Sequence, residues 1–163
     1  MKKYELTNET INCYGKTLYR IKRLSDGLLG GYVESEDNLS QDGDCFIFDD
    51  AQVFGYSRVF DDALVTGNAL VTGNALVTGN ALVTGNARVS GNARVFGNAQ
   101  VFGNAQVFGY ARVFGDAQVF GDARVSSNAR VTDDAQVYDN AQVSGNAQVT
   151  GNAQVTGNAH VFD

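Results

Sequence analysis

From Ile47 onward, an aliphatic residue recurs at every sixth position without a break. The series has twenty members, nineteen of them Val, and its last member is Val161. A small residue stands two positions before each one, in eighteen cases Ala, with Cys45 and Ser57 as the exceptions. The unit reads G-N-A-x-V-x, most plainly from residue 67 to residue 90. The helical spacing i, i+3, i+4, i+7 fits nowhere in this region, so the pattern indicates strands.

The A-x-V segment predicts a very short strand with one buried side. Successive side chains of a strand point to opposite sides, so Ala and Val share an interior and x faces outward. Gly and Asn, which adopt positive φ most readily, follow at the place where the chain must turn a corner. One such strand cannot bury its apolar side alone. The repeat therefore predicts a solenoid in which each strand pairs with its equivalent in the next turn. Each buried Val contributes roughly 1.5–3 kcal/mol relative to exposure.

The hexads resemble the repeat of left-handed parallel β-helix proteins, in which three hexads form one eighteen-residue coil. The resemblance implies an all-β, left-handed, three-sided solenoid of six to seven coils, roughly 30 Å long at about 4.8 Å per coil. Outside the hexads, the segments K-Y-E-L-T-N-E-T-I, T-L-Y-R-I at 17–21 and G-G-Y-V-E-S-E-D-N-L-S at 30–40 carry a closer likeness. They resemble a group of small bacterial and phage proteins that are labelled putative acyltransferases, over essentially the whole chain.

The N-terminal segment lies outside the hexad register. Residues 4–6 and 18–21 alternate apolar and polar around Tyr14-Gly15-Lys16, which predicts a β-hairpin. A solenoid needs a polar cap at each end, so we interpret residues 1–38 as an N-terminal cap and residues 39–163 as the hexapeptide-repeat β-helix, within a single domain. A binding module is the alternative for the first segment, because it is basic.

The outward x positions sort into three columns when they are stacked with a period of eighteen. One column begins with Phe46, Leu64 and Leu82, an apolar stripe that predicts an interface. The alternative to an interface is that the stacked Leu side chains are simply exposed to solvent. The position after each Val holds nine of the ten Phe residues on all sides of the solenoid, which favours ladder stacking over a pocket.

A column of carboxylates adjoins another face. Arg58, Arg112 and Arg130 each stand four residues before an Asp, which predicts a surface ion-pair network of modest energy. Stacked Asp116 and Asp134 are the alternative as a weak candidate calcium site, since calcium needs several oxygen ligands.

The formal net charge is −6, but it is unevenly distributed. Residues 1–23 carry +4 and the remainder carries −10. An acidic chain is unsuited to nucleic acid, because phosphate contacts need a basic face. No apolar run is long enough for a bilayer, and two cysteines are too few for a disulfide framework. We therefore expect no membrane partner and a reducing cytoplasm as the location.

The left-handed β-helix acyltransferases use a histidine base, usually at a subunit interface beside a loop that breaks the coil. This chain has one histidine, His160, at an outward position in the last hexad, and no insertion interrupts the register. His160 is thus only a weak catalytic candidate, and we expect no cofactor, with acetyl-CoA as the alternative. We favour the interpretation that the chain is a non-catalytic, self-associating scaffold. The last hexad has no cap, so Val161 and Phe162 are expected to join copies of the chain end to end.

Overall fold

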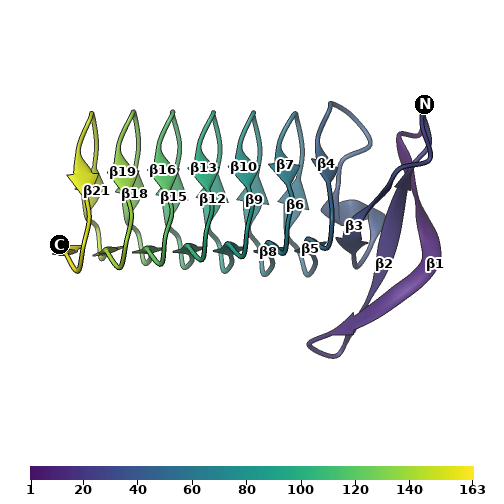
Figure 1. Ribbon diagram of the computed structural model, residues 1–163, viewed down its shortest axis with the longest axis horizontal. Coiled ribbons are helices and arrows are strands. Elements are labelled where there is room, and N and C mark those ends of the chain that lie inside the picture. Colours follow the sequence, from purple (N-terminus) through teal and green to yellow (C-terminus); the bar gives the residue numbers. More distant parts are fainter.

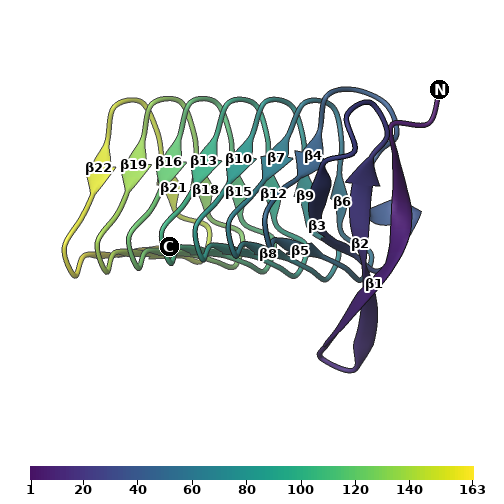
Figure 2. The ribbon, with the colours of Figure 1, turned by 45° about the vertical axis from the view of Figure 1, so that its right-hand side comes forward.

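A computed structural model describes residues 1–163 as a three-sided prism of short parallel strands with an antiparallel cap at one end (Figure 1). The coils stack along the long axis (Figure 2), and the C-terminus lies at the end opposite the cap (Figure 1). Strands eighteen residues apart are direct neighbours, as where Leu64 pairs with Leu82. The all-β, three-sided parallel solenoid is therefore confirmed, and its left-handed sense stays a prediction.

Three sheets form the sides, and we name their outer surfaces faces A, B and C in the order in which the chain visits them from residue 52 onward. Face A continues from the cap through β5 (Gln52–Val53), β8 (Leu70–Val71), β11 (Arg88–Val89), β14 (Gln106–Val107), β17 (Arg124–Val125), β20 (Gln142–Ser144) and β23 (His160–Phe162). Face B consists of β6 (Arg58–Val59), β9 (Leu76–Val77), β12 (Arg94–Val95), β15 (Arg112–Val113), β18 (Arg130–Val131) and β21 (Gln148–Val149). Face C consists of β4 (Phe46–Ile47), β7 (Leu64–Val65), β10 (Leu82–Val83), β13 (Gln100–Val101), β16 (Gln118–Val119), β19 (Gln136–Val137) and β22 (Gln154–Val155).

The interior is a column of Ala and Val, as the repeat predicts. Every repeat Ala and Val between residues 51 and 143 is fully buried. The two exceptional small residues are buried as well, and the Ser57 hydroxyl lies 2.6 Å from the carbonyl oxygen of Phe54. The backbone amide of each x residue donates to the Ala carbonyl one coil later, as from Gln100 to Ala117 at 2.9 Å. Side-chain burial and these inter-coil hydrogen bonds therefore repeat with the same period.

The corners depend on left-handed backbone. Gly79 has a φ of 68°, and a Cβ there would lie 2.9 Å from the amide nitrogen of Gly97. Asp49, Asp61 and Asp139 take the same conformation in place of Gly. The Asp49 carboxylate accepts hydrogen bonds from the Thr66 hydroxyl at 2.5 Å and the Gly67 amide at 2.9 Å, one coil later. We call this arrangement a corner bridge, and it recurs from Asp61 to Thr78 and Gly79 and from Asp139 to Thr156 and Gly157.

The cap contains the predicted hairpin. Strands β1 (Tyr4–Cys13) and β2 (Lys16–Arg23) pair antiparallel across a turn at Tyr14 and Gly15, and Tyr14 has a φ of 50°. A third strand, β3 (Leu29–Val33), pairs antiparallel with β2 and parallel with β5, and so connects the cap to face A. The 3-10 turn η1 (Glu36–Asn38) follows it and is the only helical element, so no helix of this chain could cross a bilayer.

The first coil is closed by buried polar contacts. The Tyr4 side chain is fully buried, and its hydroxyl donates to the carbonyl of Leu39 at 2.6 Å. Burial raises the pKa of this hydroxyl, which therefore stays protonated. The ammonium of Lys3 donates to the Cys45 carbonyl at 2.8 Å. These contacts attach β1 to the loop that leads into the solenoid.

Candidate functional site

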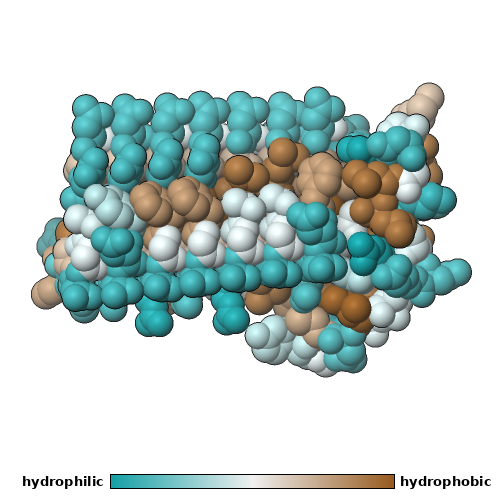
Figure 3. Space-filling model, viewed as in Figure 1, coloured by the Kyte–Doolittle hydropathy of each residue, from teal (hydrophilic) through white to brown (hydrophobic).

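Face C carries an apolar band along the rod. Figure 3 shows it between two polar edges, starting at the cap and continuing towards the far end. The band contains the partly buried residues Leu64, Leu82, Phe102, Phe120 and Tyr138. The outward positions of this face are free of charge, because they hold only apolar, Gln, Thr and Tyr side chains.

The predicted apolar stripe is wrong at its first residue. Phe46 is only 1% exposed, because the cap and its own coil cover it: the Arg23 guanidinium of the cap lies 5.2 Å from its ring centroid, and Phe48 of the first coil packs edge-on at 4.9 Å. The prediction placed Phe46 on the surface from its position in the hexad alone. The repeat carries no information about which residues the cap covers. Leu64 and Leu82 remain at the surface, so the use of this face as an interface stays a prediction.

The predicted stacking of outward aromatic residues is confirmed for five of them, whereas Phe108 has no aromatic neighbour in its column. Phe96 and Phe114 lie 4.7 Å apart with an interplanar angle of 3°, and Phe102, Phe120 and Tyr138 continue the same geometry on face C. Each ring covers the face of the next, so the rings within a ladder present their edges to solvent. The ladders therefore stabilise the solenoid surface and do not converge on a pocket.

The predicted ion-pair network is absent. No acidic side chain lies within ion-pair distance of Arg58, Arg112 or Arg130, because all six salt bridges involve bases in residues 2–23. The spacing of four residues suits an ion pair on a helix, but along extended chain it spans roughly 13 Å. The corner side chains bond to the next coil instead, as where the Asn98 amide donates to Asp116 at 2.9 Å.

Neither the candidate calcium ligands nor the candidate catalytic histidine lies among side chains that would complete a site. Asp116 and Asp134 occupy successive coils of one corner, but nowhere do three or more His, Cys, Asp or Glu side chains gather as metal ligands would. His160 is exposed on β23, where its neighbour in register is Gln142. Val161 is partly buried on the same strand, and Phe162 is 78% exposed.

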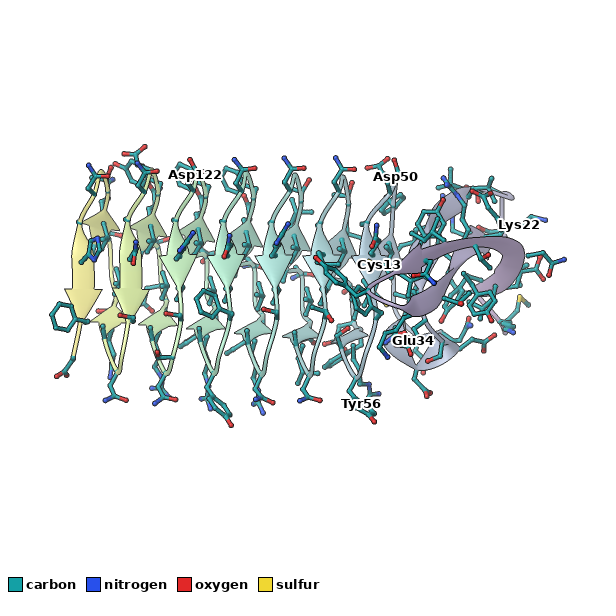
Figure 4. The ribbon with its side chains drawn as sticks, turned by 90° about the horizontal axis from the view of Figure 1, so that it is seen from below. Cys13, Lys22, Glu34, Asp50, Tyr56 and Asp122 are labelled. Atoms are coloured by element: carbon teal, nitrogen blue, oxygen red, sulfur yellow. The ribbon has the colours of Figure 1, made fainter.

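A groove that the sequence did not predict lies between the capping loop 34–41 and the first coil at residues 55–60. Its volume is about 770 Å³, and Glu34 and Tyr56 lie near each other at this junction (Figure 4). Glu34 accepts from the Lys16 ammonium and from the Gly55 amide, at 2.7 and 2.8 Å. The Lys16 bond, followed by the Gly55 bond, lowers the pKa of this carboxyl. Glu34 therefore holds the cap on the solenoid and is no free acid or base.

The comparison with protein families agrees with the architecture. A family model described as the YdcK beta solenoid repeat matches residues 87–103, 117–133, 135–149 and 141–157, about a third of the chain. The match stops short of the cap and the first coils. No curated protein matches the chain. Together, the repeat match and the three parallel sheets support the conclusion that this chain is a β-solenoid repeat protein.

Proposed function

We propose that this protein is a non-catalytic scaffold, a β-solenoid that presents flat faces and associates with further copies of itself. The observation that supports it best is the regularity of the surface. Outward side chains bond or stack with their equivalents one coil away, as Phe96 does with Phe114 and Asn98 with Asp116, and do not converge on one point. A catalytic site brings its acid, base or nucleophile together with groups that stabilise the transition state.

Self-association draws support from apolar groups that solvent can reach. Face C offers Leu64 and Leu82, and Phe162 is largely exposed on β23. A reducing cytoplasm is the compartment that we propose, since Cys13 and Cys45 are both free thiols.

The test is solution mass by light scattering over a wide range of protein and salt concentration, followed by titration with acetyl-CoA. We expect a mass above that of one 17.4 kDa chain and no binding of acetyl-CoA. A monomer throughout would contradict the scaffold proposal. Saturable acetyl-CoA binding, together with acetyl transfer that His160→Ala abolishes, would establish the alternative, an acyltransferase-like protein acting at a subunit interface.

A further inference from the structure

The arginines of the solenoid have no oppositely charged partners within the chain. Each salt bridge uses a base of the cap, and the solenoid's six arginines use none. Arg94, Arg112 and Arg130 even stand directly opposite one another on neighbouring strands, where like charges destabilise a sheet. A partner that supplies carboxylates at the same spacing would remove this cost.

Face B carries its positive charges along one long margin and its negative charges along the other. Arg58, Arg94, Arg112 and Arg130 form a column beside the A–B corner, and the B–C corner that ends the same coils carries Asp62, Asn98, Asp116 and Asp134. Three of the four coils that have an Arg at one margin therefore have an Asp at the other. Between the margins runs the column that contains Phe60, Phe96 and Phe114.

We propose that face B binds face B of a second copy, across a two-fold axis parallel to the solenoid axis. This inference rests on the proposed self-association and assigns it to face B, in place of face C and the last strand. The axis leaves each coil at its own height and exchanges the two margins, so Arg112 of one copy lies opposite Asp116 of the other. Arg130 then meets Asp134 in the same way. On the coils that carry Phe60, Phe96 and Phe114, the arginine also lies beside the partner's Phe, a geometry that permits cation–π contact, whereas the coil of Arg130 holds Thr132 at that position.

The other pairings of like faces are electrostatically worse. A two-fold axis across face B would make the rods antiparallel and set Arg against Arg. Face C is bounded on both sides by aspartates, including Asp116 at one corner and Asp50 and Asp122, which share one long edge in Figure 4. Either two-fold axis would therefore oppose acid to acid there. The hairpin tip overhangs the first coils of face A, since Cys13 and Tyr14 share a hollow with Asn86 and Arg88.

The size of face B indicates a weak, salt-sensitive dimer. Six strands at about 4.8 Å and a side of roughly 18 Å give about 500 Å² from each copy. The total of about 1,000 Å² lies at the lower limit of specific interfaces. Ion pairs at an exposed margin are screened by salt, so the dissociation constant should rise with ionic strength.

Charge exchange between the margins tests the proposal. In the full chain, R112D/R130D should weaken dimerisation on the order of 100-fold, because four cross-copy pairs become repulsive. The variant R112D/R130D/D116R/D134R keeps the net charge and should restore the dimer. R88D/R124D, with the same charge change on face A, serves as the matched control and should alter the dissociation constant less than about threefold. Circular dichroism verifies that each variant is folded.

Disulfide cross-linking distinguishes parallel from antiparallel association of the two copies. In a Cys13→Ser background, Leu76→Cys on β9 and Asn80→Cys at the B–C corner of the same coil mark the two margins of face B. Parallel copies should form a disulfide only in a mixture of the two variants, because the axis sets each margin against the other. Antiparallel copies would bring like margins together and cross-link Leu76→Cys with Arg130→Cys on β18, which would overturn the axis. A wild-type monomer would contradict both the scaffold and this interface, whereas an oligomer that R112D/R130D leaves intact would overturn face B alone.

Discussion

At the residue scale, this protein depends on what can occupy the left-handed corner position. Most corners use Gly, which carries no Cβ and so lets two coils approach each other. Asp occupies the position at residues 49, 61, 133 and 139, and there its carboxylate accepts a hydrogen bond from the amide of the Gly one coil later. A short acidic side chain is therefore tolerated, because the hydrogen bond that its carboxylate accepts offsets the strain of the left-handed backbone.

Replacing Gly79 by Ala should destabilise the protein by about 1–3 kcal/mol. The left-handed backbone costs an Ala roughly 1–2 kcal/mol, and the added Cβ would in addition lie 2.9 Å from the Gly97 nitrogen. Gly151→Ala is the matched control, since Gly151 has a φ of 62° and no atom near the missing Cβ. The urea midpoints should fall for both variants, and further for Gly79→Ala. Equal losses would show that contact between coils contributes nothing.

The corner bridges predict a loss of stability in acid. Hydrogen bonds from Thr66, and then from the Gly67 amide, lower the pKa of the Asp49 carboxyl in the folded state. Its contribution is thus complete above the unfolded-state pKa near 3.9 and disappears as the pH falls through the lower folded-state pKa. Urea midpoints between about pH 5 and pH 2 should fall less steeply for Asp49→Asn than for the wild type. The difference should stay below about 1 kcal/mol, because the group is exposed.

At the element scale, the junction between the cap and the first coil depends on one buried amide. Asn38, at the end of η1, is 1% exposed and makes four hydrogen bonds. Its oxygen accepts from the amides of Glu34 and Ser35, and its nitrogen donates to the carbonyls of Gly55 and Ser57, all at 2.9–3.1 Å. The side chain therefore joins the end of β3 to the corner between β5 and β6.

Replacing Asn38 by Ala should detach this junction. Buried backbone groups that lose their partner cost about 1–3 kcal/mol each, so we expect a loss of at least 2 kcal/mol. Hydrogen exchange should become faster in β3 and η1 while the amides of β13 to β16 remain protected. Asn68→Ala, at an exposed corner, is the control and should change neither. Uniform loss of protection along the rod would mean that the cap does not open separately.

At the scale of the whole molecule, the solenoid is a one-dimensional array, because each coil pairs only with the coils next to it and the cap contacts only the first coils. Removing one complete coil, residues 73–90, returns every later residue to the same face and restores all inter-coil pairs. The shortened chain should fold, with its urea m-value lowered by roughly a tenth in proportion to the surface lost. Loss of the β-sheet circular dichroism signal would contradict the interpretation that each coil depends only on the coils next to it.

The repeat by itself determined the period of the coil, the Ala and Val interior, the Gly corners and the stacked aromatic ladders, because each depends on residues that recur at equal intervals. The hairpin was also readable, since its alternation and turn are local. Only the tertiary structure decided that Phe46 is covered, that Asn38 joins the cap to the first coil, and that Arg112 and Asp116 are too far apart to pair. Phe46 and Asn38 contact segments that share no period with them, so only the placement of the cap brings these groups together. Arg112 and Asp116 do share the period, but the extended backbone and the corner between them hold their side chains apart.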